Sequence, residues 1–119
     1  MNIHIIDDNK DITDAISLFA ESQNHQCTVS NDGRKRYDRI INEDFDLILL
    51  DIAMPEFSGY DILSKLTDKG NFEMSKIVVI TASNLDGYAS GKIEALGIYK
   101  LVRKPLSLEA LEDIFSKFV

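Results

Sequence analysis

The chain has 119 residues, enough for one domain with a core of its own. Hydrophobic residues make up 45% of the sequence and charged residues 28%, which is typical of a folded globular protein and argues against intrinsic disorder. Because 20 acidic residues outnumber 13 basic ones and give a net charge of −7, the composition disfavours direct binding to DNA or RNA.

Nothing in the sequence indicates secretion or a membrane segment. No apolar run approaches the roughly 18 residues that a spanning helix needs. The segment MNIHIIDDNKD has neither a basic leader nor a small-residue cleavage site, so we expect no signal peptide. Cys27 is the only cysteine, which excludes an internal disulfide. We therefore expect a cytoplasmic protein that does not interact with membranes.

Short apolar runs alternate along the chain with segments of helical periodicity. The run Leu47–Leu50 is too short for a helix and is typical of a central strand buried on both faces. The expected strands are 3–6, 27–29, 47–50, 77–80 and 101–102. The expected helices are 12–20, 37–41, 59–66, 85–96 and 108–118. This strict alternation predicts an α/β fold, a doubly wound parallel sheet in a three-layer sandwich.

Two of the expected helices carry additional local signals. Asp8 or Asn9 is expected to cap the first helix. Gly87 and Gly91 fall inside the fourth helix, and each costs up to about 1 kcal/mol relative to alanine. We therefore expect the fourth helix to be the least stable of the set.

Polar side chains follow four of the predicted strands. Asp7 and Asp8 come after the first, Asp51 after the third, Thr81 after the fourth and Lys104 after the fifth. Taken singly, these residues are more simply helix caps or a surface lysine. Together they meet at the edge where this fold binds ligands. Three carboxylates and one ammonium give a formal charge of about −2, which Mg²⁺ would neutralise, and the lysine and threonine suit an anionic phosphoryl group.

The order and spacing of these residues resemble the receiver domains of two-component response regulators. The motif comprises Asp7-Asp8, Asp51 after Leu-Ile-Leu-Leu, Pro55, Gly59, Thr81-Ala82 and Lys104-Pro105. The resemblance covers essentially the whole chain and implies one receiver domain over residues 1–119. It also implies a flavodoxin-like sandwich with strand order 2-1-3-4-5 and five helices.

The resemblance further implies a phosphoryl acceptor and a metal site. Asp51 would be the nucleophile that takes a phosphoryl group from a phosphohistidine. Asp8, Asp51 and the backbone carbonyl of Ala53 would bind Mg²⁺ directly, and Asp7 would act mostly through a bound water. These roles are carried over from the family pattern onto the matching residues of this chain.

The implied switch residues follow the fourth and fifth strands. Lys104, joined to Pro105 by a cis peptide bond, would pair with the phosphoryl oxygens, and Thr81 would hydrogen-bond them. The family usually has Tyr or Phe three residues before the lysine, where this chain has Leu101. Tyr99 lies two residues earlier, on the same strand face by the two-residue period. The sequence leaves open whether Leu101 or Tyr99 contributes to the switch.

These features predict a signalling switch and not a metabolic enzyme. The chain would accept a phosphoryl group from a sensor histidine kinase or phosphotransfer protein. It would then change its surface for a downstream protein partner or a missing output domain. Its own chemistry would be limited to forming and losing the aspartyl phosphate. The main alternative is a constitutive protein-interaction module with a receiver fold that phosphorylation does not switch.

Two other uses of an acidic α/β site fit the residues less well. A phosphatase of the haloacid dehalogenase type needs a second aspartate two residues after the nucleophile, where this chain has Ala53. A flavin carrier needs a Ser/Thr/Gly-rich phosphate loop after the first strand, where the segment Asp7-Asp8-Asn9-Lys10 is acidic instead.

Overall fold

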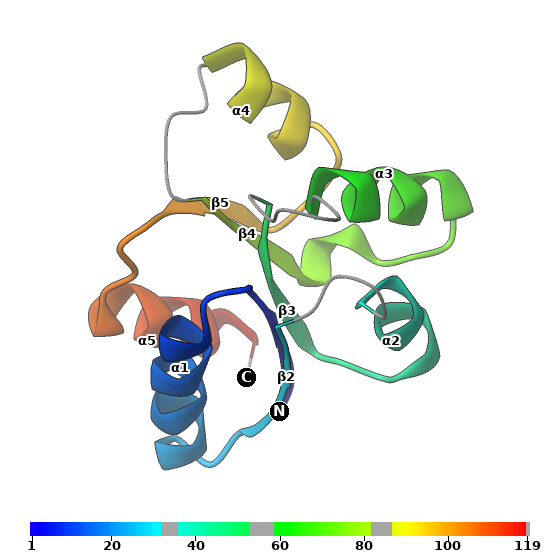
Figure 1. The fold of residues 1–119 in the computed structure, drawn as a ribbon. Helices are drawn as coiled ribbons and strands as arrows, with labels where there is room; N and C mark the ends of the chain where they lie inside the picture. Colours follow the sequence, from blue (N-terminus) through cyan, green and yellow to red (C-terminus); the bar gives the residue numbers. More distant parts are fainter. Residues whose placement is uncertain (32–35, 53–58, 82–86, 119) are drawn as a thin grey trace.

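The computed structural model describes residues 1–31, 36–52, 59–81 and 87–118 and has a parallel sheet with helices on both faces (Figure 1). Its strand order is β2-β1-β3-β4-β5, which confirms the predicted topology. The strands are β1 (Asn2–Ile6), β2 (Gln26–Ser30), β3 (Leu47–Asp51), β4 (Ile77–Thr81) and β5 (Lys100–Arg103). The helices are α1 (Lys10–Ser22), α2 (Arg36–Asn42), α3 (Gly59–Lys69), α4 (Gly87–Glu94) and α5 (Leu108–Phe118), with a 3₁₀ turn, η2 (Met74–Lys76), before β4.

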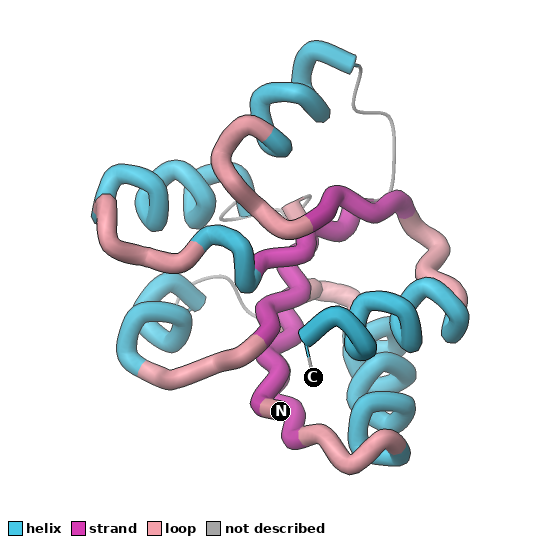
Figure 2. Tube along the Cα trace, turned by 180° about the vertical axis from the view of Figure 1, so that it is seen from behind, coloured by secondary structure: helices cyan, strands magenta, loops and turns pink. Residues whose placement is uncertain are grey.

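Each face of the sheet has its own hydrophobic core, because successive strand residues point to opposite faces. Leu47 and Leu49 of β3 belong to the core that α1 and α5 cover. Ile48 and Leu50 belong to the core that α2, α3 and α4 cover. Figures 1 and 2 show α1 and α5 together on one side of the sheet and α2 and α3 on the other. All residues of β3 and β4 are buried, as expected for central strands of a doubly wound sandwich.

The helix ends refine the sequence predictions. Asn9 and not Asp8 caps α1, because its side-chain oxygen accepts from the backbone amides of Asp11 and Ile12 at 3.0 and 3.3 Å. The fourth helix ends at Glu94, two residues earlier than predicted. Gly97 follows with φ of +92°, a left-handed conformation that commonly closes a helix. The turn η2 was not predicted.

The glycines of α4 are not required by packing. A Cβ at Gly87 or Gly91 would meet nothing within 4 Å. On the buried side of this helix, the Ser90 hydroxyl has no hydrogen-bond partner among the residues that the structure describes. A buried hydroxyl without a partner costs stability, as does each glycine in a helix. Both features agree with a weak α4, and its rank as the least stable helix remains a prediction.

Within the described ranges, no helix has the length and apolar character needed to cross a membrane.

A buried polar network joins β1, β2 and α2. His4 has no exposed surface, and its Nε2 lies 2.8 Å from Oγ of Ser30. Arg39 donates to the same hydroxyl at 3.2 Å, so the proton of Ser30 is available for a neutral imidazole. The ring of His4 lies against Phe45, with centroids 4.5 Å apart. Burial, followed by the charge of Arg39, lowers the pKa of His4 to about 4.

The free energy of unfolding is expected to depend on pH through His4. Between its ordinary pKa of 6.5 and its folded value of about 4, the unfolded chain binds a proton that the folded chain does not. This proton uptake should lower the free energy of unfolding by about 3 kcal/mol as the pH falls through that window. Urea unfolding at several pH values should show a flatter dependence for His4→Leu than for the unsubstituted protein. His25→Leu is the control and should keep most of the dependence; equal pH slopes for His4→Leu and the parent would contradict the assignment.

Candidate functional site

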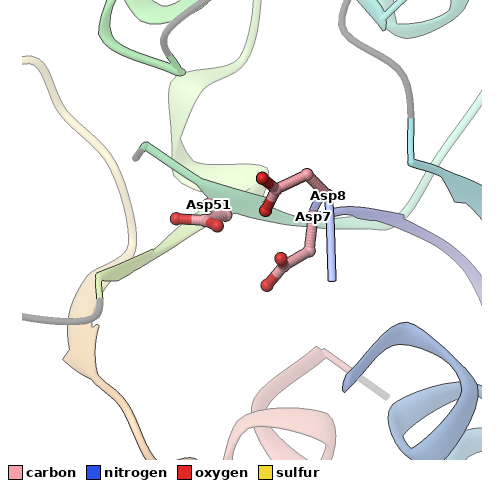
Figure 3. A group of neighbouring side chains, drawn as sticks. All are labelled: Asp7, Asp8 and Asp51. Atoms are coloured by element: carbon pink, nitrogen blue, oxygen red, sulfur yellow. The ribbon is translucent and has the colours of Figure 1, made fainter. Parts of the chain in front are cut away.

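Four of the predicted site residues, Asp7, Asp8, Asp51 and Lys104, come together at the carboxyl edge of the sheet. Asp7 and Asp8 follow β1, and Asp51 is the last residue of β3. One carboxylate oxygen from each of these aspartates lies within 4.8 Å of the others. Figure 3 shows the three side chains gathered around the ends of β1 and β3. The parallel register brings them together, because Ile6 pairs with Leu50 and the next residues along the two chains are Asp7 and Asp51.

The three carboxylates differ in their exposure to solvent. Asp7 and Asp51 are each 2% exposed, whereas Asp8 is exposed. Thr81 ends the neighbouring strand β4 and is also 2% exposed. Asp7, Asp51 and Thr81 are therefore buried where their strands end, whereas the side chain of Asp8 reaches solvent.

Lys104 supplies the positive charge of the site. Its Nζ lies 2.8 Å from Oδ2 of Asp7 and 3.3 Å from Oδ2 of Asp51. Burial opposes the charged form of Lys104, but its close contacts with the carboxylates of Asp7 and Asp51 outweigh this effect and raise its pKa. The lysine is therefore a permanent cation at neutral pH. Its backbone amide also donates to the carbonyl of Thr81 at 2.7 Å, which ties the segment after β5 to the end of β4.

The charges and ligand atoms of this cluster suit a divalent cation. Three carboxylates and one ammonium sum to a formal charge of about −2, and carboxylate oxygens are the ligands that Mg²⁺ prefers. Oδ1 of Asp7 already accepts from the backbone amide of Asn9 at 2.9 Å. Of the three carboxylates, that of Asp8 is the most exposed to solvent. The predicted metal residue Ala53 lies outside the described residues, as do the motif residues Pro55 and Ala82.

The sequence as a whole matches the family model of the response regulator receiver domain over residues 3–116. This chain belongs to the response regulator receiver domain family. The response regulator GtcR of Aneurinibacillus migulanus is 30% identical to the receiver over 115 residues, which cover 94% of this chain and 45% of GtcR. The matches span about half or less of the length of the curated relatives.

Solved structures share the receiver fold. A two-component response regulator from Clostridium difficile has a TM-score of 0.85 and 23% identity, with 99% of this chain and 94% of that chain covered. The response regulator TrrA from Thermotoga maritima was solved in complex with Mg²⁺-BeF. It has a TM-score of 0.81 and 19% identity, with coverage of 99% and 98%. At these identities the likeness establishes the fold of the receiver.

The two candidate switch residues of this receiver lie in different surroundings. Leu101 is half-buried in β5 and packs against the core that α2, α3 and α4 cover. Tyr99 precedes the strand and is 41% exposed. Its ring makes an edge contact with Phe118 of α5, with centroids 4.9 Å apart. The expectation that the two side chains share one strand face is therefore wrong, because β5 begins only at Lys100.

The expected cis peptide bond between Lys104 and Pro105 is present.

One residue beside the receiver site, Asn31, is not part of the receiver motif in the sequence. The side-chain amide of Asn31, the first residue after β2, donates to the backbone carbonyl of Asp7 at 2.7 Å. The signal available in the sequence was a polar residue directly after a second strand that neighbours β1. That signal predicts a place near the site but not a particular contact, because polar residues after strands are usually turn formers.

Proposed function

We propose that residues 1–119 form one receiver domain that accepts a phosphoryl group on Asp51 and acts as a phosphorylation-activated switch. The observation that carries this proposal is the arrangement around Asp51, the last residue of a fully buried strand. Its Oδ2 lies 3.3 Å from Nζ of Lys104, and two further carboxylates lie beside it. A lone buried carboxylate would be a poor acceptor for an anionic group, but here a cation is held next to it. Membership of the receiver family supports the same chemistry.

The transfer itself forms one bond and breaks another. An oxygen of Asp51 would form a bond to phosphorus while the P–N bond of the donor phosphohistidine breaks, and that bond's electron pair would stay on the imidazole nitrogen. Lys104 would offset the negative charge on the phosphoryl oxygens, and the Thr81 hydroxyl would donate to one of them. Asp8, Asp51 and the Ala53 carbonyl would hold Mg²⁺, with Asp7 acting through a water. When bound, the metal would reduce repulsion between the acceptor carboxylate and the phosphoryl group.

Phosphorylation would be read out on the surface near β4 and β5. Thr81 lies at the end of β4, directly beside the segment that carries Lys104. Leu101 and Tyr99 contact different neighbours, so each could report a change at Thr81 to a different helix. We propose that this change alters binding to a downstream partner or to an output domain outside this chain, in the cytoplasm. The donor would be a sensor histidine kinase or a phosphotransfer protein.

Acetyl phosphate provides a direct test, because a small donor needs no docking surface. The protein is incubated with acetyl phosphate in Mg²⁺ or in EDTA, and its intact mass is measured. A Mg²⁺-dependent gain of one phosphoryl group would support the proposal. Binding of Mg²⁺ without any gain, repeated with a second small donor, would instead favour the constitutive interaction module.

An apolar groove beside the site is the surface that we propose for the phosphodonor protein. The groove has a volume of about 390 Å³ and lies between α1 and α5. It is lined by Ile12, Ala15, Ile16, Lys104, Pro105, Leu106, Leu108 and Leu111. A carrier that brings its phosphohistidine to Asp51 would lie close to this groove, because Lys104 both contacts Asp51 and lines the groove. The groove extends from that lysine, so the carrier protein would bury it.

Leu108→Glu is expected to separate donor docking from chemistry. Leu108 is 61% exposed, so the substitution should leave the fold intact. Labelling by acetyl phosphate should stay unchanged, while transfer from a phosphorylated histidine phosphotransfer domain that labels the parent should fall at least about tenfold. Leu18→Glu is the matched control, because Leu18 is 69% exposed on α1 and does not line the groove. Equal transfer rates for Leu108→Glu and the parent would exclude the groove as the docking surface.

A further inference from the structure

A hydrogen-bonded clamp holds the loop between β1 and α1. The side-chain nitrogen of Asn31 donates to the backbone carbonyl of Asp7 at 2.7 Å and to Oγ1 of Thr13 at 3.0 Å. Oγ1 of Thr13 in turn donates to the carbonyl of Lys10 at 3.0 Å. The clamp, defined as Asn31 and Thr13, therefore joins the end of β2 to both the loop and the first turn of α1.

The chemistry of the partners determines the orientation of the Asn31 amide. The Asp7 carbonyl can only accept, and the Thr13 hydroxyl uses its one proton on Lys10. Both hydrogens of the amide nitrogen therefore have defined acceptors. The backbone amide of Asp7 donates to the carbonyl of Ser30 at 3.2 Å, so the Asn31 side chain extends the β1–β2 hydrogen-bond ladder by one step beyond the strands.

We propose that Asn31 is a positioning residue for the metal site, acting through the backbone of Asp7. This inference rests on the proposed function, because it assigns Asn31 to the same Mg²⁺ site. The loop that the clamp restrains carries two of the three clustered carboxylates, Asp7 and Asp8 (Figure 3). Without Asn31, the Asp7 carbonyl loses its side-chain donor. The loop then keeps the backbone bond from Asp7 to Ser30, the ion pair between Asp7 and Lys104 and the local contact between Asn9 and Asp7, but it loses its side-chain link to the residue after β2. The two carboxylates would then have to be ordered at the expense of metal-binding free energy.

The test measures Mg²⁺ binding by titration calorimetry, without any phosphoryl donor. Asn31→Ala and Thr13→Val should each raise the dissociation constant for Mg²⁺ about five- to tenfold. Thr13→Ser keeps the hydroxyl and should bind within about twofold of the parent. Asn71→Ala is the matched control, since Asn71 is an exposed amide before η2, at the opposite end of the sheet. Melting temperatures in EDTA are measured for every variant.

A second readout separates positioning from a general loss of stability. At saturating Mg²⁺, the acetyl phosphate labelling rate of Asn31→Ala should return to that of the parent, while its half-saturating Mg²⁺ concentration stays raised. A Mg²⁺ dissociation constant within twofold of the parent for Asn31→Ala would overturn the inference, whatever its melting temperature. If Asn31→Ala does not fold, the same threshold applies to Thr13→Val, which removes half of the clamp from the other side. A parent protein that shows no Mg²⁺ binding at all would overturn both the inference and the proposed function.

Discussion

Asp51→Asn is expected to abolish the Mg²⁺-dependent gain of a phosphoryl group from acetyl phosphate, lowering the labelled fraction at least about 100-fold. The amide has nearly the shape of the carboxylate but lacks the anionic oxygen that forms the bond to phosphorus. Because Lys104 keeps its closer contact with Asp7, at 2.8 Å, the folded structure should persist. Intact mass after a timed reaction measures the effect, and a thermal melt checks the fold.

The control for this substitution removes the same charge elsewhere. Asp113 is exposed on α5, so Asp113→Asn should label like the parent. Labelling of Asp51→Asn at the parent rate would mean that another residue accepts the phosphoryl group. Peptide mapping of the labelled protein would then identify that residue.

Lys104→Met is expected to change metal binding and phosphorylation in opposite directions. Methionine keeps much of the side-chain length but removes the ammonium, which leaves three carboxylates without their cation. Mg²⁺ should then bind about three- to tenfold more tightly, because the local formal charge becomes more negative. The labelling rate at saturating Mg²⁺ should nevertheless fall about 100-fold, because the phosphoryl oxygens lose a positioned positive charge.

The same substitution should make stability depend on the metal. Asp7 is 2% exposed, and without Lys104 it is a buried carboxylate that has lost its ion pair. The melting temperature of Lys104→Met should therefore drop in EDTA and recover in Mg²⁺. Lys100→Met is the control, since Lys100 is exposed on β5. Weaker Mg²⁺ binding by Lys104→Met would contradict this account of the charge balance.

The sequence by itself determined the α/β architecture and the location of the site. The uninterrupted apolar runs that became β3 and β4 could only be strands covered on both faces. Parallel strands end at one edge of a sheet, so Asp7, Asp51 and Thr81 had to approach one another. These inferences depend on local periodicity and on topology, which a single sequence carries.

Only the tertiary structure decided how individual side chains pair. It places Lys104 closer to Asp7 than to Asp51, makes Tyr99 a neighbour of α5 and joins Asn31 to the Asp7 backbone. Strand register and the exact starts and ends of strands set these contacts. A shift of one residue in strand register would send a side chain to the other face of the sheet. Such distances between segments remote in sequence arise from packing, so no local pattern predicts them.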